Sequence, residues 1–255
     1  NILVAEAGVV LAEVHAAAEA AGRRFPLSLA AQGSATVGGL ISTNAGGTQV
    51  LRFGPMRALL LGIEAVLPDG QRIAGLSGLR KDNRGYDLRQ LLAGAEGTLG
   101  VITAAALRLV AQPAARTTAW VGLAGPDNAL ALLRRIEAVT GDAVESFELI
   151  PDDGLALVLR HIPGARAPLA GPHRWHVLVE AASAAEPVER ALAGAIAAGE
   201  VEDAAIAASE AQAAALWHLR ESMSEAERLD GIAAKHDVSV PVAGMPRFIG
   251  EARTA

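Results

Sequence analysis

The sequence predicts an α+β protein with two domains, and three observations indicate this organisation. From Thr117 onward, strand-like and helix-like segments alternate, a pattern typical of helices packed on a sheet. Earlier, a Pro-Asp-Gly turn at 68–70 lies between two apolar segments and predicts a β-hairpin, because proline presets φ and glycine accepts φ > 0. The step Gln112-Pro113 separates the two patterns. We therefore expect one domain over 1–112 and a second over 113–255.

In the first domain, each expected element has a local signal. Gly22 ends the first helix. Val37, Leu40 and Ile41 have the i, i+3, i+4 spacing of a short buried helical turn. Asp87 is a side chain that can cap a helix N-terminus. The expected elements are a strand at 2–6, a helix at 9–21, hairpin strands at 61–67 and 71–76, a helix at 87–93, and a strand at 98–110.

The second domain is expected to place its helices on one face of a sheet. Three prolines between residues 163 and 172 predict a long loop within it. In chain order, its expected elements are strand 117–123, helix 127–139, strand 143–150, helix 152–160, strand 174–181, helix 186–199, strand 204–207, and a long helix over 209–229.

Composition excludes several classes of function. A formal net charge of −6 with mixed signs disfavours nucleic-acid binding, which needs a basic face. No uninterrupted apolar run is long enough to predict a membrane span. The chain has no cysteine, so disulfides, thiolate catalysis and Cys-bound zinc are excluded. We expect a cytoplasmic location.

The most informative segment is 33–54, which contains six glycines interleaved with serine, threonine and asparagine. Glycine lets the backbone approach a ligand closely, and small polar side chains beside it offer hydrogen bonds without bulk. The spacing differs from the nucleotide motifs GxGxxG and GxxxxGK[ST]. A flexible linker is the alternative, but the apolar residues inside the segment disfavour it. The segment predicts a loop that wraps a flat or phosphorylated cofactor.

Five segments in order carry a resemblance to a known family. They are Phe-Pro-Leu-Ser-Leu at 25–29, the glycine-rich stretch at 33–47, Arg-Phe-Gly at 52–54, the run at 79–88, and Gly-Ala-Glu-Gly-Thr-Leu-Gly-Val-Ile-Thr at 94–103. In this order the chain resembles the FAD-linked D-2-hydroxy-acid dehydrogenases of the vanillyl-alcohol-oxidase-type superfamily, most closely the D-2-hydroxyglutarate and D-lactate dehydrogenase-like branch. The resemblance implies the second subdomain of a PCMH-type FAD-binding domain followed by a ferredoxin-like substrate or cap domain, truncated at its C-terminal end.

The resemblance also implies where FAD binds. Glu96, Gly100 and Ile102 would line the adenosine half, largely through backbone groups, although Glu96-Gly97-Thr98 also fits a simple tight turn before a strand. The pyrophosphate, ribityl chain and isoalloxazine would contact Gly33, Ser34, Gly38, Gly39, Thr43, Asn44, Ala45, Gly46 and Gly47.

A second set of residues is implied to bind the substrate. Arg220 and Ser224 are spaced i, i+4 and are expected on one helix face, where a guanidinium and a hydroxyl could converge on a carboxylate. The resemblance adds Lys235 and assigns all three to the hydroxy acid's carboxylates, with Ser224 where the closest branch usually has threonine. The alternative is an amphipathic surface helix with salt bridges to Glu221 or Glu225.

The implied activity is oxidation of a D-2-hydroxy acid to the 2-oxo acid with hydride transfer to FAD. The chain is expected to be an internal fragment, inactive alone, because the family's pyrophosphate loop and its His-rich C-terminal region are missing. The catalytic base and a divalent metal are expected only in that downstream region, and we interpret the stretch with His173 and His176 as the entry to a strand rather than a metal pair. Expected partners are a 2-hydroxy acid, an electron acceptor such as electron-transfer flavoprotein or quinone, and a second copy in a homodimer.

Two alternatives to this activity stay open at the level of the sequence. The first is another FAD-linked oxidase of the superfamily, such as a glycolate oxidase subunit. The second is a folded scaffold without flavin or catalysis.

Overall fold

The computed structural model describes residues 1–79 and 81–252, and it divides into two compact units. The first unit is Asn1–Gln112, and the second begins at Pro113. This division coincides with the expected step between the two sequence patterns. Arg80, part of the segment 79–88 that carries the family resemblance, lies outside the described residues.

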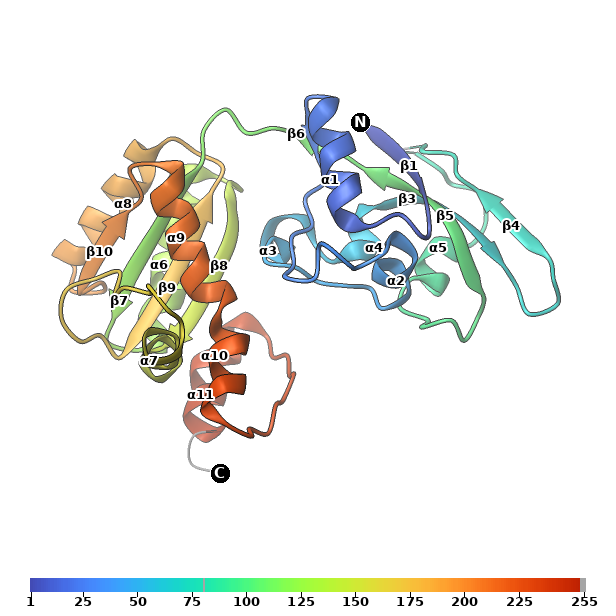
Figure 1. Cartoon of the computed structure of the whole chain (residues 1–255). Helices are drawn as coiled ribbons and strands as arrows, with labels where there is room; N and C mark the ends of the chain where they lie inside the picture. The colour runs from blue at the N-terminus through green and yellow to red at the C-terminus, as the bar shows by residue number, and fades with distance from the viewer. Residues whose placement is uncertain (80, 253–255) are drawn as a thin grey trace. The chain divides into compact units, whose positions relative to one another are not determined.

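The first unit is built on an antiparallel sheet with strand order β1-β5-β3-β4 (Figure 1). The predicted hairpin is confirmed: Val66 of β3 pairs with Arg72 of β4, and the Leu67 amide donates to the Gln71 carbonyl at 2.8 Å. Gly70 has φ +84, as the turn requires. The strands of this unit are β1 (Ile2–Glu6), β2 (Arg23–Arg24), β3 (Leu60–Val66), β4 (Arg72–Gly75), β5 (Val101–Arg108) and β6 (Val110–Ala111).

Helices, most of them short, pack on the hydrophobic core of this unit. The core includes the buried Leu11, Ile41, Met56 and Leu107. The expected turn of helix at 37–41 is confirmed, and Thr36 caps it by accepting from the Gly39 amide. Asp87 caps the fifth helix as predicted, accepting from the Arg89 amide. The helices are α1 (Leu11–Ala20), α2 (Val37–Ser42), α3 (Val50–Phe53), α4 (Met56–Leu59) and α5 (Leu88–Leu92).

The second unit contains an antiparallel four-stranded sheet with order β10-β7-β9-β8. In chain order the strands therefore lie 4-1-3-2, which is the ferredoxin-like arrangement expected from the sequence. The strands are β7 (Thr117–Leu123), β8 (Val144–Pro151), β9 (Trp175–Ala181) and β10 (Asp203–Ile206). The helices are α6 (Pro126–Thr140), α7 (Asp152–His161), α8 (Ala185–Ala197), α9 (Glu210–Glu221), α10 (Met223–Asp230) and α11 (Met245–Ala252), with a 3₁₀ turn at Val242–Gly244.

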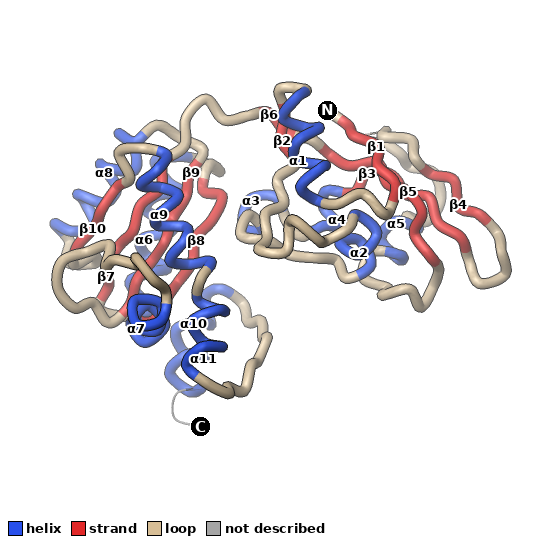
Figure 2. The backbone as a smooth tube through the Cα atoms, viewed as in Figure 1, coloured by secondary structure: helices blue, strands red, loops and turns tan. Residues whose placement is uncertain are grey.

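Helices cover both faces of this sheet, so the expectation of one covered face is wrong. Helices α6 and α8 pack on one face, and α7, α9 and α10 pack on the other; Figures 1 and 2 show α9 in front of the strands and α6 behind them. Every residue of the central strands β7 and β9 is buried. Strands buried on both faces lose the apolar–polar alternation that would have revealed the second layer.

The two faces differ in chemistry. The face under α6 and α8 is apolar and includes Val121, Val177 and Val179. The opposite face alternates with it along the strands and carries polar side chains among its apolar ones. Those buried polar residues include Thr118, Ser146, His176 and Glu180.

The expected long helix over 209–229 is instead two helices, which is a correction to the sequence prediction. Helix α9 ends at Glu221, α10 begins at Met223, and Ser222 is the residue between them. The Ser222 hydroxyl lies 3.4 Å from Nδ1 of His218. Serine favours such side-chain contacts over a regular helix interior, which is consistent with the break at this residue. No helix among the described residues is long and apolar enough to span a membrane.

A buried hydrogen-bond chain fixes the protonation of His176. The indole Nε1 of Trp120 donates to His176 Nδ1 at 3.1 Å, and Asp152 Oδ1 lies 3.4 Å from Nε2. Because an indole N–H can only donate, Nδ1 must be the acceptor and the neutral ring carries its proton on Nε2. Desolvation lowers the pKa of His176 below its ordinary value of 6.5, in spite of the opposing effect of Asp152.

This depressed pKa predicts that acid destabilises the second unit. Above pH 6.5 the His176 ring is neutral in both the folded and unfolded chain. Below it, the unfolded chain takes up a proton that the folded chain resists, so the free energy of unfolding falls until the pH passes the folded pKa. All three tryptophans lie in the second unit, so their fluorescence during urea unfolding at about pH 7.5 and about pH 5.5 reports the effect.

The matched variant is His176→Gln, which does not titrate. Its free energy of unfolding should fall less over the same pH interval than that of the parent protein. Equal falls in both proteins would contradict the assignment of a lowered pKa to His176.

Candidate functional site

The two segments predicted to contact FAD meet in the first unit, although they lie about 50 residues apart in sequence. Helix α2 ends within the glycine-rich segment, and a turn at 94–97 closes over that end. The Gly94 amide donates to the Ile41 carbonyl, and the Glu96 amide donates to the Ser42 carbonyl, each at 3.0 Å. The bond from Glu96 gives the Ser42 carbonyl a partner that a helix C-terminus otherwise lacks, and the bond from Gly94 adds a second donor to the Ile41 carbonyl, which also accepts from the Asn44 amide at 3.0 Å. The segments 36–47 and 94–100 therefore form one surface, called the glycine junction below.

The glycine junction holds both of the described non-glycine residues with positive φ: Asn44 at +49° and Glu96 at +48°. Such backbone conformations cost free energy, and they gather at ligand-binding sites. Asn44 is held by its side chain, whose Oδ1 accepts from the Arg57 amide at 3.0 Å. Arg57 also donates from Nη2 to the Ala93 carbonyl at 2.7 Å. The surrounding structure thus fixes two strained residues at the place where the sequence predicts cofactor contact.

The glycines of the junction differ in why they must be small. A Cβ on Gly47 would lie 2.2 Å from the Ser28 carbonyl oxygen, and one on Gly38 would lie 2.8 Å from Ala7 Cβ. A Cβ on Gly100 would lie 2.9 Å from the Val66 carbonyl oxygen. Gly33 precedes the junction, and a Cβ on it would have no neighbouring atom within 4 Å. The chain's own packing therefore requires three of these glycines, whereas Gly33 faces open space that a ligand could use.

The remaining predicted FAD contacts are largely backbone positions. Thr43 Oγ1 donates to the Gly39 carbonyl at 3.0 Å, so the helix engages this hydroxyl. Ile102 is 7% exposed and belongs to the core of the unit, with its side chain turned away from solvent. Ser34, Ala45 and Gly46 lie in the loops on either side of α2. This arrangement agrees with contact through N–H and C=O groups at these positions.

In the second unit, the three predicted substrate residues come from different segments. Arg220 lies near the end of α9, Ser224 is exposed on α10, and Lys235 follows α10 in a loop. Arg220 and Ser224 therefore lie on two helices that meet at Ser222, and helical hydrogen bonds from the Ser222 amide to the His218 carbonyl and from the Ala226 amide to the Ser222 carbonyl continue across this point. Lys235 Nζ pairs with Glu227 Oε2 at 2.9 Å. Since Glu227 and Ser224 are spaced i, i+3 on α10, this pair brings the ammonium to the side of α10 that carries Ser224.

Arg220 has an acidic partner that the sequence analysis missed. Its Nε donates to Glu148 Oε2 of β8 at 2.7 Å, so the partner is neither Glu221 nor Glu225. Helix α9 has a second polar attachment to the sheet, because Trp217 Nε1 donates to Glu180 Oε2 at 2.9 Å. The only sequence signal for these partners was an acidic residue inside an otherwise apolar strand, and it does not name the basic residue.

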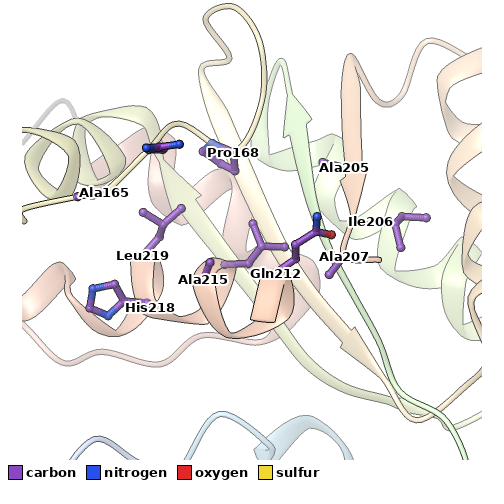
Figure 3. A pocket seen from close by; sticks show the side chains of 12 residues that line it. Ala165, Pro168, Ala205, Ile206, Ala207, Gln212, Ala215, His218 and Leu219 are labelled. Atoms are coloured by element: carbon purple, nitrogen blue, oxygen red, sulfur yellow. The ribbon is translucent and has the colours of Figure 1, made fainter. Parts of the chain in front are cut away.

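A pocket in the second unit contains none of the predicted site residues. It measures about 430 Å³ and lies between the loop at 164–168, β10 and α9. Figure 3 shows Leu219, Ala215 and Gln212 of α9 facing Pro168 across it, with Ile206 on the neighbouring strand. Aliphatic side chains make up most of the lining, and Arg166, Gln212 and His218 also reach it. Within residues 1–79 and 81–252, no group of three or more His, Asp or Glu side chains could hold a metal ion.

Comparisons with known proteins agree with this division into two units. Residues 1–74 match the family model described as FAD binding domain. Residues 112–255 match the model described as FAD linked oxidases, C-terminal domain. The chain therefore belongs to the family of FAD-linked oxidases.

Individual proteins show to which members of this family the chain is similar. The chain is 37% identical over 99% of its length to the mitochondrial D-2-hydroxyglutarate dehydrogenase of Bos taurus, and covers 47% of that protein. It is 38% identical over 98% of its length to D-2-hydroxyglutarate dehydrogenase of Xanthomonas citri pv. viticola, covering 52% of it. The chain thus spans about half the length of these curated relatives. A solved structure of alkyldihydroxyacetonephosphate synthase matches 90% of this chain and 44% of its own, with a TM-score of 0.67 and 15% identity, and shows the fold alone.

The glycine junction yields a stability prediction. Gly47→Ala should destabilise the first unit by about 1–3 kcal/mol, because its Cβ would overlap the Ser28 carbonyl. Gly33→Ala is the matched control and should change stability by less than about 0.5 kcal/mol. Differential scanning calorimetry measures both. Equal losses in the two variants would show that the loop packs differently from this account.

Proposed function

We propose that the chain is part of an FAD-dependent dehydrogenase that oxidises a D-2-hydroxy acid to its 2-oxo acid, with D-2-hydroxyglutarate as the substrate. The observation that carries the proposal is the pair of sites just described. One unit offers a strained, glycine-lined surface, and the other offers a guanidinium, a hydroxyl and an ammonium from neighbouring segments. The names of the relatives support the choice of D-2-hydroxyglutarate.

The residues of the glycine junction fit the proposed cofactor. Gly33, just before the junction, has open space around it, which lets a flat ring or a phosphate approach the backbone. Asn44 and Glu96 have positive φ, a backbone conformation that is found preferentially at ligand-binding sites. Bound FAD would supply the acceptor for the substrate's α-hydrogen as hydride.

The chain's own residues would bind and orient the substrate. D-2-hydroxyglutarate carries two carboxylates, and two cations are suited to them. Arg220 presents a planar fork that binds a carboxylate with two parallel hydrogen bonds. Lys235 adds a compact charge whose present partner, Glu227, is a partly exposed surface carboxylate. Surface ion pairs are weak, so a substrate carboxylate can compete for this ammonium, and the Ser224 hydroxyl can donate beside it.

The proposal includes further partners that the full-length protein would need. An electron-transfer flavoprotein or a quinone would reoxidise the flavin. D-Lactate is the alternative substrate within the same branch. A glycolate-type oxidase is the second candidate function, and the presence of two cations rather than one favours the dicarboxylate over glycolate.

The test is substrate preference together with an Arg220 variant in the full-length protein. Reduction of a dye should be fastest with D-2-hydroxyglutarate among D-2-hydroxyglutarate, D-lactate and glycolate. Arg220→Ala should lower kcat/KM for D-2-hydroxyglutarate by about a hundredfold or more, because a charged hydrogen-bond donor to the carboxylate is lost.

Arg135→Ala is the control, because Arg135 is bound by Glu200 elsewhere in the second unit. It should leave kcat/KM unchanged. An Arg220→Ala effect below about threefold, under 1 kcal/mol, would remove Arg220 from the substrate site. Preference for glycolate would favour the second candidate function.

A further inference from the structure

We infer that Glu148 is a positioning residue that orients the Arg220 guanidinium toward the substrate carboxylate. The inference rests on the proposed function and extends it from the residues that would touch substrate to one that acts through another. It is carried by the 2.7 Å hydrogen bond from Arg220 Nε to Glu148 Oε2.

The geometry of this bond leaves the recognition end of Arg220 available. Arginine has five N–H donors in a planar fork, and Glu148 accepts from the inner one. Within the described residues, no hydrogen bond or ion pair engages Nη1 or Nη2 of Arg220. A carboxylate bound at Nε fixes the plane of the guanidinium, and the two outer nitrogens remain able to bind a second carboxylate.

Partial burial makes the bond stronger than an ordinary surface contact. The Arg220 side chain is 35% exposed and that of Glu148 is 21% exposed. Exposed ion pairs contribute little because water screens them and because both side chains lose rotamer freedom. Here the acid is largely shielded, and a charge-assisted hydrogen bond of this length is among the stronger kinds.

Both partners lie on rigid elements. Glu148 of β8 is in register with Leu178 of β9, which is in register with Trp120 of β7. Leu178 and Trp120 belong to the core under α9. On the opposite side of the bond, α9 is anchored by the buried Leu219 and by the hydrogen bond from Trp217 to Glu180. A site built on a strand and a packed helix holds its geometry better than one built on a loop.

Removing the negative charge of Glu148 distinguishes two roles for this residue: orienting Arg220, or competing with the substrate for it. If Glu148 orients Arg220 through its hydrogen bond, an amide at this position can still accept from Nε and preserve the geometry. If Glu148 instead competes with the substrate for the cation, neutralising it would tighten substrate binding. Glu148→Gln and Glu148→Ala therefore give different outcomes under the two roles.

The experiment compares KM and kcat for D-2-hydroxyglutarate in the FAD-loaded, full-length protein. Glu148→Ala should raise KM by about tenfold or more, since a charge-assisted hydrogen bond that orients the binding group is lost. Glu148→Gln should keep KM within about threefold of the parent protein, because the amide oxygen can still accept from Nε of Arg220. If the negative charge of Glu148 were needed only to hold the fold, Glu148→Gln would not keep KM so close to that of the parent. Glu200→Ala, which breaks the Arg135–Glu200 pair, is the matched control and should leave KM unchanged.

A double-mutant cycle tests whether Glu148 acts through Arg220. In an Arg220→Ala background, adding Glu148→Ala should cause no further rise in KM, because there is no guanidinium left to orient. An unchanged KM in Glu148→Ala, or a lower KM in Glu148→Gln, would overturn the inference. If Arg220→Ala itself leaves KM unchanged, the proposed substrate site fails; if only Glu148→Ala is without effect, the substrate site stands and the positioning role fails.

Discussion

Two backbone hydrogen bonds, from Gly94 to Ile41 and from Glu96 to Ser42, are the constraint on which the cofactor-binding surface depends. They complete a full set of partners for the C-terminal carbonyls of α2: Gly39 accepts from Thr43, and Leu40 accepts from Ala45. Buried or crowded carbonyls need such partners, and the turn that supplies them must adopt left-handed conformations to reach α2. The strain at Glu96 therefore follows from the joining of two distant segments, and that joining creates the surface proposed for FAD.

The two faces of the sheet in the second unit have different roles. One face is apolar and packs under α6 and α8, and the other carries acids that contact α9. The face under α6 and α8 is apolar and gains its stability from burial. The face under α9 carries acids that accept hydrogen bonds from that helix, Glu148 from Arg220 and Glu180 from Trp217. Buried acids are costly without donors, so these contacts satisfy the acids and at the same time fix the helix that presents Arg220. Recognition at this face thus depends on side chains that also help to hold the unit together.

Structural elements that depend on adjacent residues could be predicted from the sequence, whereas features that depend on contacts between distant residues could not. The Pro-Asp-Gly hairpin, the Asp87 cap and the turn of helix at Val37 each follow from a few adjacent residues, and each is confirmed. The second helical layer depends on packing partners far away in sequence. The contact of Gly38, Gly47 and Gly100 with FAD stays a prediction, and the structure adds a tertiary reason for these glycines, because a Cβ at each would overlap the chain's own atoms. The Glu148 partner of Arg220 could not be found, because an acid in a strand does not reveal which of 22 basic residues it binds.

Hydrogen–deuterium exchange of the full-length protein with and without FAD would show directly whether the glycine junction contacts the flavin. We expect FAD to slow amide exchange most in the segments 36–47 and 94–100, because these backbone groups would face the cofactor. Exchange in α6 and α8 of the second unit should change little. Bound FAD that leaves exchange at 36–47 and 94–100 unchanged, while slowing it elsewhere, would contradict the assignment of the glycine junction as the flavin surface.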